Sequence, residues 1–308
     1  MSNSFCVRLT NLGVLDISGR DSAAFLQGLT TNDVGAIGPQ DAQLSSINSA
    51  QGRVEAVIMV LRQIALFRLV LQSDLVPLVA EYLRRYVLRA DVAVKTPEPA
   101  VELLGLIGTP AVEAIETSVS NDKETGNLDN IQVAKWSETS DRWLCAGEAA
   151  ILDQVDRVLQ VKDDSDSVMA WQRHDIEDGL PTIVASTRGL FLPQMINLDL
   201  LGAISFTKGC YTGQEIIART QHLGRIKRRM FRFSTASNAM PQPGQQLYQD
   251  GRPVGTVVNS AKVSQSASEI LAVLRLEAVA GQLCLAADGT GPLQRQDMAY
   301  VVEESASG

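Results

Sequence analysis

The alternation of apolar and polar positions predicts an antiparallel sheet in the first part of the chain. Residues 11–17, 42–49, 53–61 and 65–71 are short runs of strongly apolar content, and polar residues separate them. Between the first two runs, the segment after Ser18 or Asp21 predicts a helix that ends at Gly28.

A second helix is predicted after Ser73, where apolar positions return at helical spacing. Pro77 is acceptable in its first turn, because the first backbone N–H groups of a helix have no partner within it. One face of this helix is apolar, and we expect it to be the buried one; it carries Val79, Leu83, Tyr86 and Val87.

The pattern changes after residues 96–100, TPEPA, whose two prolines favour extended backbone and indicate a linker. Strand-like runs then alternate with helical stretches, and this β-α-β-β-α order predicts a small α+β subdomain. The expected strands are 101–107, 131–136 and 142–146, and the expected helices are 110–116 and 148–159.

The last part of the chain is predicted to lose its helices. One helix follows the acidic stretch at 162–167 and continues to about Glu177, where Gly179 and Pro181 end it. After about Arg225, short extended runs are separated by prolines and by Asp-Gly turns. This pattern is typical of a small barrel or sandwich.

The composition is that of an ordinary globular protein. Of 308 residues, 45% are hydrophobic and 20% charged, and the net charge is −8. These values exclude disorder for most of the chain and argue against nonspecific binding of nucleic acid over the whole surface. No apolar run is long enough to span a membrane, and the opening residues show no export or import signal. We therefore expect a cytoplasmic protein without a membrane partner.

The residue types that common enzyme sites need are scarce. The chain has two histidines, and its four cysteines, at 6, 145, 210 and 284, lie far apart. We therefore predict neither a disulfide framework nor a metal site. No GxSxG, HExxH or P-loop motif occurs, which removes the usual hydrolase and kinase interpretations.

Positive charge is concentrated in one segment. From Arg219 to Arg232 there are six basic residues and no acids. Such a strip is either a solvated strand or a contact for an anionic ligand. Direct RNA binding is the least favoured form of the second interpretation, because the acidic remainder repels polyanions and no RNA-stacking motif is present.

The segment KGCYTGQE, residues 208–215, carries the most specific chemistry. Thr212 and Glu215 have the spacing of a capping box, which predicts a helix that begins there. Cys210 then lies just before the positive helix end and two residues from Lys208, and both influences favour its thiolate. We therefore predict Cys210 and Lys208 as the reactive groups. A buried, purely structural Cys210 is the alternative.

This segment, with Ala218-Arg219 and the Gly-x-x-Lys-Arg-Arg pattern at 224–229, resembles the signature of the YgfZ family of folate-binding proteins. That family is similar in fold to the glycine-cleavage T-protein, a tetrahydrofolate-dependent aminomethyltransferase. The resemblance covers nearly the whole chain. Four further stretches occur at the expected order and spacing: FLQGLTTNDV (25–34), NSAQGR (48–53), LRRYVLRADV (83–92) and FLPQMINLD (191–199).

The resemblance implies an α+β fold with a T-protein-like folate-binding body, a ferredoxin-like subdomain and a C-terminal all-β barrel. The expected bounds are 1–97 and 166–228 for the body, 98–165 for the subdomain and 229–308 for the barrel. It also implies tetrahydrofolate or a related reduced folate as the cofactor. The implied partners are iron–sulfur client or assembly proteins, with an indirect effect on tRNA modification.

The resemblance also implies ligand contacts. Glu177 lines up with the T-protein glutamate that pairs with the pterin ring, and a carboxylate can accept two hydrogen bonds from the adjacent N–H groups of that ring. Arg219 and Arg228 are candidates for the carboxylate tail, because guanidinium groups match carboxylates. Gly209 and Tyr211 complete the predicted cofactor-binding set. A solvated Glu177 is the alternative, and His174 is assigned no role.

Glu55 and Ala56 stand where the T-protein has two adjacent aspartates. One-carbon transfer needs a group held at the reacting nitrogen, so the altered pair argues against aminomethyl transfer. We expect Glu55 to be an exposed strand residue. The first hypothesis is a folate-binding protein that supports iron–sulfur proteins, with Cys210 as its reactive or cluster-contacting group. The alternative is a folate-dependent one-carbon transferase.

Overall fold

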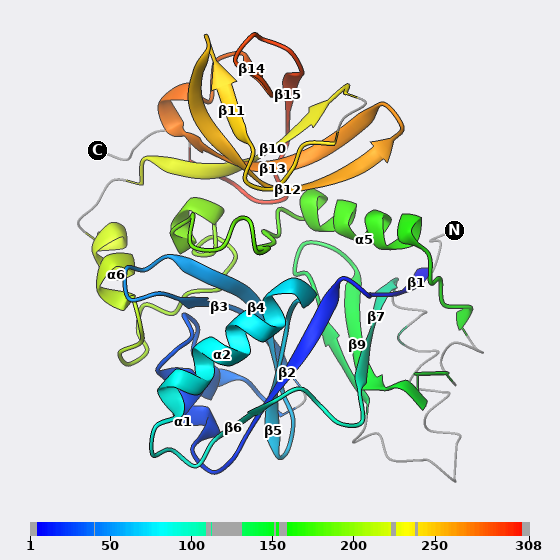
Figure 1. Ribbon diagram of the computed structural model, residues 1–308, viewed down its shortest axis with the longest axis vertical. Coiled ribbons are helices and arrows are strands. Elements are labelled where there is room, and N and C mark those ends of the chain that lie inside the picture. The colour runs from blue at the N-terminus through cyan, green and yellow to red at the C-terminus, as the bar shows by residue number, and fades with distance from the viewer. Residues whose placement is uncertain are drawn as a thin grey trace. The chain divides into compact units, whose positions relative to one another are not determined.

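The structure is a computed structural model, and it describes residues 5–39, 41–108, 112, 131–150, 152–153, 159–222, 226–237 and 240–303. The chain divides into two compact units. The first consists of residues 1–25, 35–43 and 59–171, and the second of residues 26–34, 44–58 and 172–308. The strands of the described residues form three sheets, and Figure 1 labels most of these strands.

One sheet has five strands in the order β3-β4-β5-β2-β6. Strand β2 pairs antiparallel with β5 along its whole length, from Leu12 opposite Gln72 to Ser18 opposite Leu66. The four strands predicted for the first part of the chain are confirmed to within about one residue. The bounds are β2 Leu12–Ser18, β3 Ala42–Asn48, β4 Val54–Arg62, β5 Leu66–Gln72 and β6 Ala93–Lys95.

The two predicted helices of this region are also present, as α1 (Ser22–Gln27) and α2 (Val76–Val87). Short 3-10 turns occur at η1 (Val34–Ala36) and η2 (Ser73–Leu75). Helix α2 buries Val79 and Leu83 as predicted. The expectation for Tyr86 is wrong, because its side chain lies in the last turn and is 40% exposed; its ring is tilted against that of Tyr82, with centroids 5.1 Å apart.

A second sheet has four antiparallel strands in the order β1-β7-β9-β8. Its edge strand β1 comes from the start of the chain and pairs Phe5 with Ile107. The strands predicted here are confirmed, whereas the predicted helices at 110–116 and 148–159 fall largely outside the described residues. The bounds are β1 Phe5–Arg8, β7 Val101–Ile107, β8 Ile131–Lys135 and β9 Arg142–Glu148.

Trp171 fills the core beside this sheet. Its side chain is fully buried, and the guanidinium of Arg142 lies 4.5 Å from the centroid of its ring. A Cβ at Gly105 of β7 would come within 2.6 Å of the indole, so the strand must have a glycine here for the ring to fit. Trp171 is therefore a core-packing residue.

Helix α5 (Ser165–Glu177) ends at Glu177, one of the predicted site residues. Asp164 precedes it and accepts hydrogen bonds from the backbone N–H and the hydroxyl of Ser167, both at 2.8 Å. These bonds lower the pKa of Asp164, the hydroxyl bond most, because they favour its ionised form. Gly179, with φ +69°, ends the helix as predicted. Two further helical segments follow, η4 (Pro193–Ile196) and α6 (Gln214–His222).

The C-terminal region is a closed barrel with strand order β10-β13-β12-β11-β14-β15, as predicted (Figure 1). It closes because β10 pairs with both β13 and β15. Phe231, Phe233 and Ile270 are buried in its core. The bounds are β10 Arg228–Thr235, β11 Gln246–Gln249, β12 Arg252–Ser264, β13 Ala267–Arg275, η5 Leu276–Ala278, β14 Leu283–Cys284 and β15 Pro292–Gln296.

Within the described part of the chain, no helix is both long enough and apolar enough to span a lipid bilayer.

Candidate functional site

Lys208 is a buried lysine whose amine donates two hydrogen bonds to backbone carbonyls. Its residue is 8% exposed, and Nζ donates to the backbone carbonyls of Thr30 at 2.9 Å and Asn32 at 2.7 Å. The same ammonium lies 5.2 Å from the centroid of the Tyr211 ring. Burial lowers the pKa of Lys208 to about 8, and the nearby carboxylate of Asp33 opposes that shift.

The predicted influence of Lys208 on Cys210 therefore needs correction. We expected the amine to act as a cation beside the thiol, but it donates to the segment 30–32 instead. That segment is itself held in place, since Thr31 donates its hydroxyl to Ala203 and Asn32 its amide to Gly202, both at 2.8 Å. Lys208 thus ties the KGCYTGQE segment to a firmly bonded part of the same unit.

Cys210 is exposed, whereas Lys208 before it and Tyr211 after it are buried. After it, Tyr211 is buried and its pKa is raised to about 12 by that burial. The N–H of Thr212 then donates to the carbonyl of Gly28 at 3.0 Å. Gly209 is exposed, and a Cβ added there would meet no atom within 4 Å. The thiol is therefore open to solvent, so the alternative of a buried, structural Cys210 is wrong.

The start of helix α6 also differs from the prediction. Gly213 has φ +83°, which is not helical, so Thr212 cannot be the N-cap and the helix begins at Gln214. The reason is a close approach of two backbones: a Cβ at Gly213 would lie 2.5 Å from the carbonyl oxygen of Ser49 and 2.9 Å from Cα of Gly52. The predicted end of the helix, at Gly224, lies outside the described residues.

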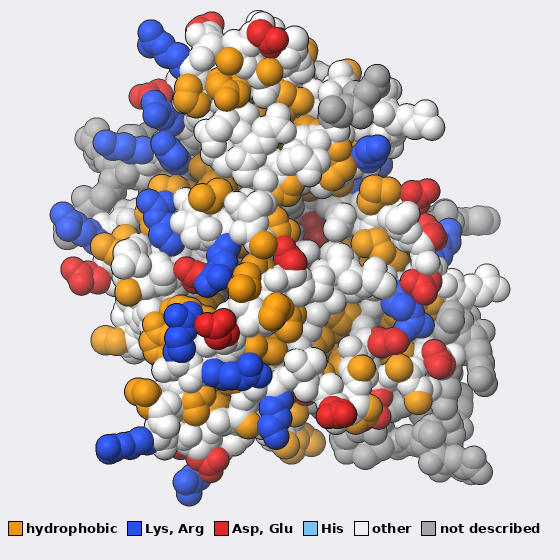
Figure 2. Space-filling view, in the orientation of Figure 1, with side chains coloured by type: hydrophobic (Ala, Val, Ile, Leu, Met, Phe, Trp, Pro, Cys, Tyr) orange, Lys and Arg blue, Asp and Glu red, His pale blue; other side chains and the backbone are white. Residues whose placement is uncertain are grey.

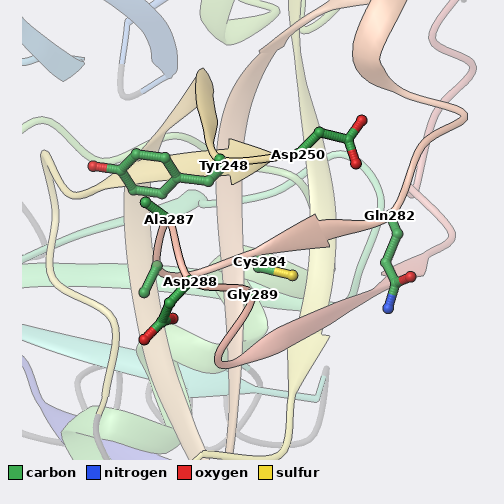
Figure 3. Close-up of a pocket in the computed structure, with 9 residues that line it drawn as sticks. Tyr248, Asp250, Gln282, Cys284, Ala287, Asp288 and Gly289 are labelled. Atoms are coloured by element: carbon green, nitrogen blue, oxygen red, sulfur yellow. The ribbon is translucent and has the colours of Figure 1, made fainter.

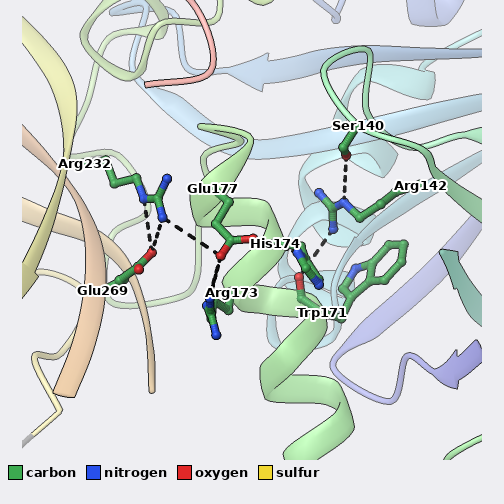
Figure 4. Close-up of polar contacts among 8 residues, drawn as sticks. All are labelled: Ser140, Arg142, Trp171, Arg173, His174, Glu177, Arg232 and Glu269. Atoms are coloured by element: carbon green, nitrogen blue, oxygen red, sulfur yellow. Dashed lines mark hydrogen bonds and ion pairs between the residues drawn. The ribbon is translucent and has the colours of Figure 1, made fainter. Parts of the chain in front are cut away.

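Glu177 is bound by basic side chains from its own helix (Figure 4). Its Oε1 accepts from Nε of Arg173 at 3.0 Å, and its Oε2 lies 2.7 Å from Nδ1 of His174. The side chain is 25% exposed, so Glu177 is partly shielded from water and paired. A carboxylate has about four lone-pair sites, so these contacts leave capacity for further hydrogen bonds.

A third basic side chain reaches Glu177 from the barrel (Figure 4). Nη2 of Arg232, in β10, lies 4.0 Å from Oε1 of Glu177. The same nitrogen donates to Oε2 of Glu269, in β13, at 2.7 Å. Arg232 therefore lies between two carboxylates that come from different elements.

Glu55 is not the exposed strand residue that we expected. Its side chain is 14% exposed, and its Oε2 accepts a hydrogen bond from Nε of Arg188 at 2.5 Å. A charge-assisted bond of this kind occupies the carboxylate and balances its charge. Glu55, which stands in place of one of the two T-protein aspartates, is thus part of an ion pair.

The basic strip, Arg219 to Arg232, offers fewer cations to an anionic ligand than its sequence indicates, because two of its arginines are paired with acids. Arg229 is buried against Asp199 with a shortest N–O distance of 2.6 Å, and Arg232 is paired as described above. Arg219, on α6, and Arg228, at the start of β10, are exposed, and neither has a hydrogen bond or ion pair to Glu177 among the residues described. On the face drawn in Figure 2, basic side chains lie interspersed with acidic ones.

A pocket of about 310 Å³ lies elsewhere, at one end of the barrel. Tyr248, Asp250, Cys284 and Asp288 are among its lining residues (Figure 3). None of the predicted site residues lines it. Among the residues that the structure describes, no three His, Cys, Asp or Glu side chains are grouped closely enough to hold a metal ion.

Two comparisons with known proteins bear on this site. Residues 227–297 match the family model described as the C-terminal beta-barrel domain of CAF17. Over 307 residues the chain is 28% identical to the "tRNA-modifying protein YgfZ" of Enterobacter sp. (strain 638), an alignment that covers 97% of this chain and 94% of the relative. The resemblance to the YgfZ family is confirmed.

The YgfZ-like chain also has the fold of a solved T-protein. The crystal structure of the glycine cleavage system aminomethyltransferase T from Bartonella henselae superposes with a TM-score of 0.64, covering 96% of this chain and 85% of that one. At 11% identity, this likeness concerns the fold alone. The predicted fold class, α+β with a T-protein-like body and a C-terminal barrel, is confirmed.

Several residues that contact Glu177 or Glu55 were not among the predicted site residues. Arg173 and His174 precede Glu177 by four and three positions, which is the spacing of interacting pairs on one helix face, so this signal was available. Arg188 and Arg232 lie far from their partners in sequence, and no local pattern indicates their role.

Proposed function

We propose that this protein binds a reduced folate and supports iron–sulfur proteins through the Cys210 thiol, without acting as an aminomethyltransferase. The observation that carries the proposal is the exposure of Cys210 between the buried residues Lys208 and Tyr211. An exposed thiol on an anchored loop is accessible to a partner or substrate while keeping a defined position. This arrangement suits a group that reacts or makes a contact rather than one that packs.

The chemistry of the predicted contacts fits a reduced folate. Glu177 supplies carboxylate oxygens for the N–H groups of the pterin ring, and the side chains of Arg173, His174 and Arg232 lie around that carboxylate. Arg219 and Arg228 are exposed cations for the carboxylate tail. Tyr211 and Gly209 belong to the proposed site because they flank Cys210, and Gly209 leaves room for a ligand to approach. The folate, when bound, is the carrier of one-carbon units.

The ion pair between Glu55 and Arg188 disfavours the transferase alternative. A general base must have a lone pair directed at the proton that it removes. The short bond from Arg188 engages Oε2 of Glu55, so that oxygen is directed at the guanidinium and not at a substrate proton. A turnover assay for tetrahydrofolate-dependent release of a one-carbon unit tests this point. Robust turnover that Glu55→Gln abolishes would establish the transferase instead.

The proposed partners are iron–sulfur client or assembly proteins in the cytoplasm, and the effect on tRNA modification is indirect. The similarity to a tRNA-modifying protein of Enterobacter supports this part of the proposal. The pairing of Arg229 with Asp199 and of Arg232 with Glu269 supports an indirect effect, because it leaves fewer cations of the basic strip for direct contact with RNA. We also retain the predicted domain bounds, 1–97 with 166–228, 98–165 and 229–308.

Complementation tests the role of the thiol. In cells that lack this protein, we expect wild type and Cys284→Ala to restore the activity of iron–sulfur enzymes, and Cys210→Ala to fail. Cys284 is a matched control because it is a free, partly exposed thiol of the same unit. Full complementation by Cys210→Ala would remove the thiol from the proposal.

Calorimetry with tetrahydrofolate tests the ligand. We expect binding by wild type and by Glu277→Ala, whose side chain is 78% exposed in the barrel, and weaker binding by Glu177→Ala. Equal affinity of the two variants would remove Glu177 from the site. Absence of binding to wild type would overturn the folate assignment itself.

A further inference from the structure

We propose that the C-terminal barrel and the segment that follows it position the carboxylate of Glu177, through Arg232 and Tyr300. The inference rests on the proposed folate function, because it assigns these two residues an effect on the affinity for the pterin. Both are positioning residues, since each acts on Glu177 or on its backbone and not on the ligand.

Glu177 needs such support because of where it lies. It is the last residue of helix α5, where the partial negative charge of the helix end disfavours a carboxylate. Its local partners hold it loosely: the side chains of Arg173 and His174 are 41% and 42% exposed, and exposed ion pairs contribute little because water screens them.

Arg232 is a better fixed cation. Its side chain is 18% exposed, and two of its nitrogens donate to Oε2 of Glu269, at 3.1 and 2.7 Å. Glu269 is itself 12% exposed and lies on the neighbouring strand β13. The pair therefore holds the Arg232 guanidinium in one orientation, 4.0 Å from Oε1 of Glu177. At this distance and burial, the attraction is stronger than that of a fully exposed pair.

Tyr300 fixes the backbone two residues after Glu177. Its hydroxyl donates to the carbonyl of Gly179 at 2.8 Å and accepts from Nδ2 of Asn197 at 3.3 Å. The ring packs directly on Gly179, where a Cβ would come within 2.7 Å of it. Burial raises the pKa of Tyr300, so the hydroxyl keeps its proton and remains a donor. The turn that ends α5 is thus held by a residue that follows the last barrel strand.

A double-mutant cycle measured by tetrahydrofolate calorimetry tests the inference. Tyr300→Phe removes only the hydroxyl, and Arg232→Lys keeps a positive charge for Glu269 but shortens the side chain. We expect each to weaken binding about fivefold, as the loss of one hydrogen bond or ion pair of ~1 kcal/mol predicts. In the Glu177→Ala background, we expect neither substitution to weaken binding further, because both act through that carboxylate.

Two controls separate positioning from a general loss of stability. Tyr248→Phe and Arg252→Met change the same residue types in the same barrel, and we expect wild-type affinity from both. Thermal unfolding of every variant shows which ones are folded. If Tyr300→Phe and Arg232→Lys weaken binding equally with and without Glu177, the effect does not pass through Glu177 and the inference is wrong.

Amide hydrogen exchange gives a readout that does not need folate. We expect faster exchange at residues 176–180 in Tyr300→Phe than in wild type or Tyr248→Phe, because the turn loses its anchor. Unchanged exchange there would overturn the inference even if folate binds. Absence of folate binding together with faster exchange would instead overturn the proposed function and leave the structural anchor in place.

Discussion

Nε of Arg188 lies 2.5 Å from Oε2 of Glu55, so an acid that the family pattern associates with one-carbon chemistry is held in an ion pair. The two residues are 133 positions apart in the sequence, and both lie in the second unit. With side chains 28% and 14% exposed, the pair is partly shielded from water.

Removing one member of this pair should destabilise the protein more than removing both. We expect Arg188→Met to lower the free energy of unfolding by about 1–3 kcal/mol, because it leaves a partly buried carboxylate without its donor. The double variant Arg188→Met with Glu55→Gln should recover part of that loss. Urea denaturation measures all three, and equal effects of the single and double variants would contradict the pairing.

Lys208 should make stability depend on pH in the alkaline range. Burial lowers its pKa from 10.5 to about 8, so between these values the unfolded chain binds more protons than the folded one. Stability therefore rises with pH across that window, by up to about 2–3 kcal/mol relative to Lys208→Met. Urea unfolding of both proteins at pH 7.5 and 10 measures the difference. If the free energy of unfolding changes equally with pH in the two proteins, the pKa of Lys208 is not lowered in the folded state.

The two glycines beside Cys210 should respond oppositely to substitution. Gly213→Ala places a Cβ against Ser49 and Gly52 at φ +83°, and we expect a loss of about 2 kcal/mol or more of stability. Gly209→Ala meets open space and should change stability by less than about 0.5 kcal/mol. Weaker tetrahydrofolate binding by the stable Gly209→Ala would support ligand approach at this position. Equal stability losses would contradict the loop geometry.

The four thiols should differ in their rate of alkylation. Cys210 is exposed and should react first, Cys284 is half-buried and should follow, and Cys6 and Cys145 are buried. Burial also raises the pKa of the Cys145 thiol, which reduces its thiolate fraction further. Differential alkylation of the native protein with mass spectrometry gives the order. A slower reaction at Cys210 than at Cys284 would be incompatible with the exposed loop.

The sequence by itself determined most of the elements. Periodicity and turn residues located β2 to β5 and β7 to β9 and predicted a barrel or sandwich for the C-terminal region, but they missed the short edge strands β1 and β6. The helix ending at Gly179 followed from a glycine that the left-handed backbone there requires. These signals are local, since a strand or helix depends chiefly on residues within a few positions. The KGCYTGQE segment likewise predicted Cys210 as a reactive group.

Only the tertiary structure decided what the functional side chains contact. Lys208 donates to carbonyls at positions 30 and 32, Glu55 pairs with Arg188, and Arg232 approaches Glu177 from the barrel. These partners are brought together by the packing of distant segments, and a long side chain can turn to either side of its backbone. Sequence spacing carries no information on that choice, because burial and the position of a partner's dipole or charge decide it.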